Sequence, residues 1–495
     1  MTDLLIRNVT ALTVDAGRRV IEDAAIAVDG DRIVHVGPDA DLPAEHATAE
    51  KVIDGRGMAA IPGLIDSHSH AGHGLVRSLG AGNTGAWFAA CEEIYARGST
   101  VDFWRAEADL AQLERLMAGV TTNLTLLGGG ADIYRTDDPV FGDAHCAATT
   151  ASGLRTVLAV GPGRPPFPKP YKVFEGGEAR DVALGFERQM EVCEDLIRRH
   201  DGVLDRRTGI ALIMPVYHEH HMEEAGDAKA IREMSETVAD LRVRHGVIYT
   251  QDGHRDGTIA LAQELGTLGP FALLSHSVDL TEADFAALRE TGASIVHNPT
   301  AIMSIYGRCP APELIDEGIR VVLGSDAGAP DRGFDMFRHM KQAMLYHRRH
   351  FADPAWMPPG KVLEMATIDA AEALGLGDEL GSLEVGKKAD IVLVDMRKPH
   401  LYPANMPLTR LTHFATASDV DSVVSDGRLV MENRRVLTME VDAVLDAAQA
   451  ELIRALERTG LACLIDEPAG MWGASRFDPS DGNPWQPGER TGAKG

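Results

Sequence analysis

The apolar and polar residues of this chain follow two different patterns. Over about the first 60 residues, apolar and polar positions alternate between Gly and Asp turns, which predicts short antiparallel strands such as Leu4–Val14 and Ala24–Val28. The same pattern returns near the other end of the chain, at Ala389–Val394 and Val420–Val424. Because both ends carry it, we expect one small sheet domain assembled from the two ends.

Short apolar runs, expected to be strands, alternate with helical stretches in the middle of the chain. Helical stretches such as Ala106–Met117 and Ala228–Arg244 place apolar residues three and four positions apart, as one buried helix face requires. Repeated strand–helix units of this length predict a parallel barrel, in which the chemistry lies at the C-terminal ends of the strands. The expected strands include Thr121–Leu127, Arg155–Val160, Ile210–Val216, Val247–Thr250, Ala272–Ser275, Ser294–His297 and Val321–Gly324.

The overall composition narrows the classes of partner. A chain of 495 residues exceeds the usual single domain unless it forms a barrel with insertions. Its formal net charge of −26 argues against nucleic acid and against an anionic membrane surface, since both require clustered Lys and Arg. The five cysteines are scattered, and no window reaches the roughly 18 apolar residues of a membrane span. We therefore expect a cytoplasmic protein with reduced thiols that acts on a small molecule.

Three strand ends carry residues that are typical of a metal site. The run Gly63–His70 ends in His68 and His70, which project from one face of a strand and can reach one divalent cation. His276 and Asp326 each follow another apolar strand. Imidazole nitrogens and a carboxylate together bind Zn²⁺ or a similar ion, which lowers the pKa of water towards 7. Asp326 is therefore both a candidate ligand and a candidate base.

These motifs occur together with others along the chain. The segments are Pro62–His70, Ala118–Thr122, Ser275–His276, Val296–Thr300, Leu323–Asp326 and Gly381–Asp390. In combination they resemble the amidohydrolase superfamily, in particular the branch of cytosine and guanine deaminases and triazine hydrolases, over residues 1–440.

The resemblance implies an α/β fold, a distorted (β/α)8 barrel of the TIM type with a small composite β-sandwich domain built from both chain ends. Residues 1–60 and 380–440 would form the sandwich, 61–379 the barrel, and 441–495 a C-terminal helix and extended tail. It also implies a homodimer or homotetramer and one divalent metal ion, zinc first, with iron, manganese or cobalt as alternatives. Asp326 would bind metal and relay protons, and His276 would hold the attacking water or the substrate.

The chain departs from the family pattern at the fifth barrel strand. Deaminases of this branch have a metal-binding His there, followed three residues later by a Glu that shuttles protons. Here Gln251 stands at the position of the His and His254 at the position of the Glu. We therefore predict Gln251 as a metal ligand and His254 as the acid that protonates the leaving group.

Four further residues are candidates for contact with substrate. His218 and His220 repeat the two-residue spacing near another strand end, so they could bind substrate or complete the metal coordination; a solvated loop is the alternative. His297 ends an expected strand within a family motif. Arg308, in the loop after it, could bind a substrate carboxylate, although a surface ion pair is the commoner role of an Arg.

Together, these residues predict a metal-dependent hydrolase that acts on a small, cyclic, nitrogen-containing compound. An activated water would attack an electrophilic carbon and release ammonia, an amine, a thiol or a halide. Hydrolysis of an exocyclic amide, urea or carbamate is an alternative that the missing Glu favours, and release of a larger amine would distinguish it. The other alternative is a non-catalytic ligand-binding protein of the same fold, whose binding would ignore chelators.

Overall fold

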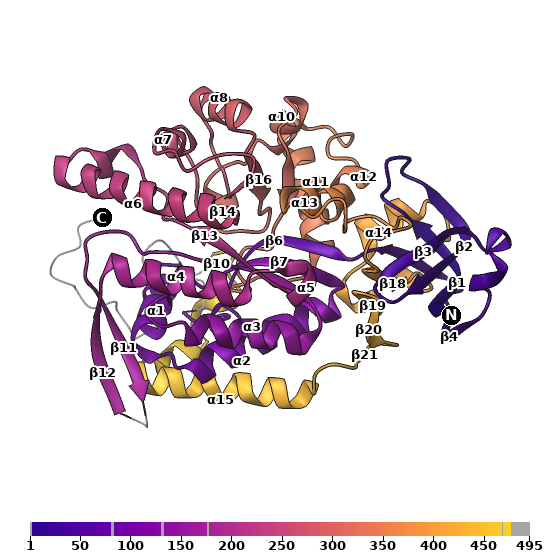
Figure 1. The fold of residues 1–495 in the computed structure, drawn as a ribbon, viewed down its shortest axis with the longest axis horizontal. Helices are drawn as coiled ribbons and strands as arrows, with labels where there is room; N and C mark the ends of the chain where they lie inside the picture. Colours follow the sequence, from indigo (N-terminus) through magenta and orange to yellow (C-terminus); the bar gives the residue numbers. More distant parts are fainter. Residues whose placement is uncertain (1, 81–83, 130–132, 176–177, 468, 477–495) are drawn as a thin grey trace.

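The centre of the molecule is a sheet of eight parallel strands that closes almost completely into a barrel (Figure 1). The computed structural model describes residues 2–80, 84–129, 133–175, 178–467 and 469–476. A bridge between Ser69 and Asp326 brings the first strand of the barrel against the end of the last. In chain order the strands are β6 (Leu64–His70), β7 (Val120–Leu126), β10 (Arg155–Val160), β13 (Thr208–Ile213), β14 (Ile248–Asp252), β15 (Ala272–Ser275), β16 (Ser294–His297) and β17 (Val321–Leu323).

Helices follow the strands and cover the outside of the barrel (Figure 1). In α6 (Ala225–His245), Ile231, Met234, Val238 and Leu241 are buried at three- and four-residue spacing, which is the periodicity that predicted the helix. The other large helices of the barrel are α2 (Val101–Met117), α3 (Val140–Ser152), α4 (Phe186–His200), α8 (Glu282–Thr291) and α11 (Met336–Phe351). This pattern confirms the predicted α/β barrel.

Strands from both ends of the chain form a second, mixed sheet, as predicted. Strand β5 (Met58–Pro62) pairs in antiparallel fashion with β18 (Ile391–Asp395), so segments more than 300 residues apart become neighbours. The strand order is β21-β20-β19-β18-β5-β1-β2-β3, and β4 pairs with β1. The remaining bounds are β1 (Thr2–Leu12), β2 (Val20–Asp29), β3 (Arg32–Pro38), β4 (Ala49–Asp54), β19 (Val420–Ser425), β20 (Arg428–Glu432) and β21 (Arg435–Val436).

Helix α15 (Val441–Thr459) follows the mixed sheet and packs along α2 (Figure 1). The last part of the predicted tail, residues 477–495, lies outside the described residues. No helix that the structure describes is both long and apolar enough to cross a membrane. The predicted domain bounds and the predicted oligomer stay predictions.

A buried ion cluster joins the barrel to the mixed sheet. Arg155 begins β10, and its side chain is fully buried. Its Nη1 donates to Asp390 Oδ2 at 2.5 Å and its Nη2 to Asp426 Oδ1 at 2.6 Å. Removal of one partner from a buried ion pair leaves the other charge uncompensated, which costs about 3–5 kcal/mol. We therefore expect Arg155→Met to lower the urea midpoint of unfolding clearly.

The matched control is Arg289→Met on the surface helix α8. Arg289 also bridges two carboxylates, those of Glu282 and Glu317, but all three groups are solvated. Exposed ion pairs contribute little, so the urea midpoint of this variant should equal that of the wild type. Equal losses in the two variants would contradict a role for burial at Arg155.

Candidate metal centre

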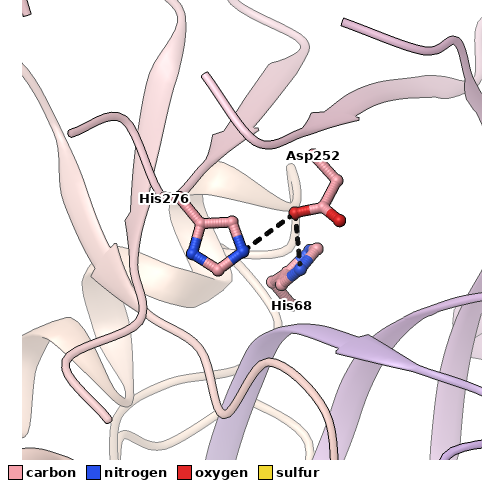
Figure 2. Close-up of side chains that lie close together, drawn as sticks. All are labelled: His68, Asp252 and His276. Carbon is pink, nitrogen blue, oxygen red and sulfur yellow. Dashed lines mark ion pairs between the residues drawn. The ribbon is translucent and has the colours of Figure 1, made fainter. Parts of the chain in front are cut away.

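Histidines and aspartates from four strand ends meet at one rim of the barrel. Strand β6 supplies His68 and His70, β14 ends in Asp252, and His276 and Asp326 follow β15 and β17. Asp252 Oδ1 lies 3.3 Å from His68 Nε2 and 3.1 Å from His276 Nε2 (Figure 2). His70 Nε2 lies 3.3 Å from Asp252 Oδ2 and also 3.3 Å from Asp326 Oδ1. The C-terminal ends of parallel strands share one edge, which is why these distant residues converge.

The donor atoms fit a divalent cation. Two groups, His68 with Asp252 and His276, and His68 with His70 and Asp326, each place their ligand atoms within 4.8 Å of one another. His68 belongs to both groups, so they describe one centre. Its ring is fully buried, and neither ring nitrogen makes a hydrogen bond to a described residue. A buried nitrogen without a hydrogen bond is costly, and a metal ion would satisfy Nε2, which faces the carboxylate of Asp252 at 3.3 Å.

Both carboxylates of the centre are ionised. Burial raises the pKa of Asp252, but the neighbouring imidazoles of His68, His276 and His70 hold that pKa well below its usual value. Burial also raises the pKa of Asp326, and the guanidinium of Arg332 followed by His276 lowers it further than burial raises it. The centre therefore presents two negative charges and several imidazoles, a donor set that suits Zn²⁺, Fe²⁺ or Mn²⁺.

The fifth strand places Asp252, rather than Gln251, among these donors. Gln251 donates from Nε2 to the carbonyl of Pro215 at 3.0 Å. Successive side chains point to opposite faces of a strand, and Tyr249, on the same face as Gln251, belongs to the hydrophobic cluster that also contains Val238 of α6. Gln251 thus lies on the helix-facing side, and Asp252 projects into the rim. The sequence pattern did not single out Asp252, and Gln251 as a ligand stays a prediction.

His254, the predicted acid, lies just beyond β14 and is fully buried. Its Nδ1 is 3.0 Å from the hydroxyl of Thr258, and its Nε2 has no hydrogen-bond partner among the described residues. Burial lowers the pKa of His254 to about 3. The ring is therefore neutral at pH 7, and a proton for the leaving group would have to come from its neutral N–H.

The four predicted substrate contacts are not gathered at the centre. His218 and His220 lie past the end of β13, at the short helix η4 (Glu219–Met222), with ring centroids 5.5 Å apart. His297 ends β16, but its Nε2 is 3.1 Å from that of His347 on α11. Arg308 donates to the carboxylate of Glu313, the alternative that the sequence left open. Contact with substrate stays a prediction for all four.

One buried histidine, His73, and one buried tyrosine, Tyr95, lie behind His70. The ring of His73 stacks on that of His70 with a centroid distance of 4.8 Å. Its Nδ1 is 2.9 Å from the hydroxyl of Tyr95, and both residues are buried. His73 was visible in the sequence as a third histidine three positions after His70, whereas nothing in the sequence indicated Tyr95.

A buried network ties the strand of the histidines to the loop of Asp326. Asp66 accepts hydrogen bonds from the backbone N–H of Ser325 at 2.8 Å and from its hydroxyl at 2.6 Å. Arg115 donates to the hydroxyl of Ser69 at 2.6 Å. These bonds fix β6 relative to Asp326, because Ser69 lies between the two histidines and Ser325 directly precedes Asp326.

The sequence of the chain is similar to those of known proteins. The sequence profile of the Amidohydrolase family matches residues 59–430. Over 469 residues, 92% of this chain and 98% of the relative, the chain is 34% identical to a 5-methylthioadenosine/S-adenosylhomocysteine deaminase of Syntrophobacter fumaroxidans. It is 28% identical over 468 residues, 91% of this chain and 97% of the relative, to a 5'-deoxyadenosine deaminase of Methanosarcina acetivorans.

Solved structures share the fold. An adenosine deaminase from Xanthomonas campestris with bound zinc superimposes with a TM-score of 0.77 at 22% identity, covering 92% of this chain and 99% of the other. An atrazine chlorohydrolase from Arthrobacter aurescens complexed with zinc gives a TM-score of 0.74 at 25% identity, covering 91% of this chain and all of the other.

Proposed function

The chain belongs to the amidohydrolase family, and we propose that it is a metal-dependent deaminase of adenine nucleosides whose 5′ position lacks a hydroxyl or carries a thioether. The family match confirms the resemblance seen in the sequence. The observation that carries the proposal is the convergence of His68, His70, Asp252, His276 and Asp326 within one buried cluster. The two relatives named above are deaminases of such nucleosides, and adenine is a cyclic, nitrogen-containing compound with an exocyclic amino group.

His68, His70, Asp252 and Asp326 would hold the metal, with zinc as the first choice because the solved relatives carry it. When bound, a divalent cation in this centre supplies a hydroxide for attack at neutral pH, because it lowers the pKa of water towards 7. The chain's own residues then have to orient the water, take its proton and stabilise the charge that develops on the purine ring.

Asp326 and His276 are placed to handle the attacking water. Asp326 Oδ1 lies 4.0 Å from His276 Nε2, so one water molecule can contact both groups. The ionised carboxylate of Asp326 accepts the proton. Nε2 of His276 faces the centre, 3.1 Å from Asp252 Oδ1, while the side-chain nitrogen of Asn298 lies 3.5 Å from Nδ1, so an N–H at Nε2 would point towards the water. That N–H can orient the water or stabilise developing negative charge.

The products of the reaction test this proposal. The zinc-loaded protein should release ammonia from 5′-deoxyadenosine, 5′-methylthioadenosine or S-adenosylhomocysteine, with the absorbance change of adenine becoming hypoxanthine. The control substrates are an aryl urea and an aryl carbamate, from which a larger amine would be released. Release of an amine from these control substrates, with no ammonia from any of the three nucleosides, would instead support the amide, urea or carbamate hydrolase. The replacement of Glu by a neutral His254 favours that alternative.

A chelator separates catalysis from simple binding. Treatment with a strong chelator should abolish ammonia release, and added Zn²⁺ should restore it. Nucleoside binding that persists unchanged in metal-free protein, with no turnover in either form, would favour the non-catalytic binding protein.

A further inference from the structure

Two carboxylates share the centre where the family pattern has one carboxylate and an additional imidazole. Nε2 of His70 lies 3.3 Å from an oxygen of Asp252 and 3.3 Å from an oxygen of Asp326. A divalent cation beside one carboxylate keeps a net positive charge, whereas two carboxylates cancel that charge. The positive charge is what makes water acidic and stabilises an anionic transition state. A further positive charge beside one of the carboxylates would restore the charge that the second carboxylate removes.

Arg332 is the cation that the structure supplies. It lies in the loop between β17 and α11, and its Nη1 donates to Asp326 Oδ2 at 2.6 Å. Only 4% of its side chain is exposed, so solvent does little to screen the charge. Its other acidic neighbour, Asp331, has a carboxylate that is 72% exposed and lies 3.7 Å from Nε. Asp326 is therefore the principal partner of Arg332.

We infer that Arg332 is a positioning residue that binds one oxygen of Asp326 and offsets the negative charge that Asp252 adds to the metal centre. The two oxygens of Asp326 thereby take different roles: Oδ2 faces the guanidinium, and Oδ1 lies towards His70, His68 and His276 at 3.3, 3.9 and 4.0 Å. With Arg332 counted, the centre has the same formal charge that it would have with an imidazole at position 252.

The inference rests on the metal site of the proposed function and not on the identity of the substrate. It predicts how charge changes at positions 252 and 332 combine. Arg332→Met makes the centre more negative, Asp252→His makes it more positive, and the double variant returns to the formal charge of the wild type. A purely structural role of Arg332 predicts the opposite effect on metal binding, because a displaced Asp326 would bind metal less well.

The test measures zinc affinity by chelator competition and the visible spectrum of the Co²⁺-loaded protein. We expect Arg332→Met to bind zinc at least about tenfold more tightly while kcat falls about 10- to 100-fold, since the cation becomes a weaker acid. Asp252→His should bind zinc more weakly than the wild type. The double variant should match the wild type in zinc affinity within about threefold and exceed both single variants in kcat.

Two variants separate charge from shape. Arg332→Lys keeps the positive charge, so its zinc affinity and Co²⁺ spectrum should match those of the wild type. Arg338→Met removes an exposed arginine six residues further along the chain and should change neither. Weaker zinc binding in Arg332→Met would overturn the inference, and this result does not depend on whether Asp252→His folds. A double variant that is less active than both single variants would also overturn it.

The outcome can be distinguished from failure of the proposed function. Zinc affinities that follow this order in a protein that releases no ammonia from nucleosides would leave the inference standing and overturn the substrate assignment. Ammonia release by the wild type, together with weaker zinc binding in Arg332→Met, would support the substrate assignment and overturn the inference.

Discussion

Replacement of Asp326 by Asn is expected to lower kcat at least about 1,000-fold in a protein that stays folded. The amide can still accept the hydrogen bond that Arg332 donates at 2.6 Å, so the loop should keep its conformation. An amide cannot take a proton from water, however, and a positioned base contributes about 10²- to 10⁴-fold to a rate. The measurement is ammonia release from the best nucleoside substrate, together with circular dichroism and zinc content.

Asp331→Asn is the matched control for this variant. Asp331 lies in the same loop, but its carboxylate is 72% exposed and does not contact the centre. Its removal should change kcat less than twofold. Normal turnover in Asp326→Asn would remove Asp326 from the mechanism, and equal losses in both variants would point to a general disturbance of the loop.

Replacement of Asp252 by Ala is expected to weaken zinc binding at least about 100-fold and to abolish turnover at low metal concentration. Asp252 contacts three imidazoles of the centre, at 3.1–3.3 Å, and is one of the two carboxylates available to the cation. Even outer residues that only orient ligands contribute about 10- to 100-fold to metal affinity, so the loss of a ligand should exceed that range. Chelator competition measures the affinity directly.

Gln251→Leu tests whether the neighbouring residue in the same strand, Gln251, is the metal ligand instead of Asp252. Its side-chain amide donates to the carbonyl of Pro215, and its face of the strand packs against helices. Zinc affinity should therefore stay within about threefold of the wild type. If Gln251→Leu loses the metal and Asp252→Ala retains it, Gln251 is the ligand after all, as the sequence alone suggested.

The sequence was sufficient to predict the barrel, the composite sheet and much of the candidate centre. His68 and His70 lie in the last three residues of β6, His276 directly follows β15, and Asp326 lies three residues past the end of β17. The C-terminal ends of parallel strands meet at one edge of a barrel. The strand-end rule therefore brings these four together without any knowledge of distances. The mixed sheet was equally visible, because alternating apolar positions mark short strands at both chain ends.

Asp252 was missed because of a shift by one residue. Side chains alternate with a period of two along a strand, so Gln251, predicted as the ligand, and Asp252, which contacts the histidines, lie on opposite faces of β14. The same alternation turns His297 towards α11, although it ends its strand. A strand end alone does not determine which face a side chain occupies.

Contacts between distant loops had no sequence signal. Arg332 reaches Asp326 from six residues further along the chain, and Asp66 bonds to Ser325, 259 residues away. Neither spacing is periodic, so no pattern could predict these pairs.

His218 and His220 were expected near a strand end. Strand β13 ends at Ile213, five residues before His218, and the two histidines lie in the loop and short helix beyond it.

The most direct test of the metal centre is a crystal structure of the zinc-loaded protein with anomalous scattering recorded at the zinc edge. We expect one strong anomalous peak at about 2.0–2.2 Å from ring nitrogens of His68 and His70 and from carboxylate oxygens of Asp252 and Asp326. A peak that leaves out both aspartates, or no peak in protein that still turns over, would contradict it.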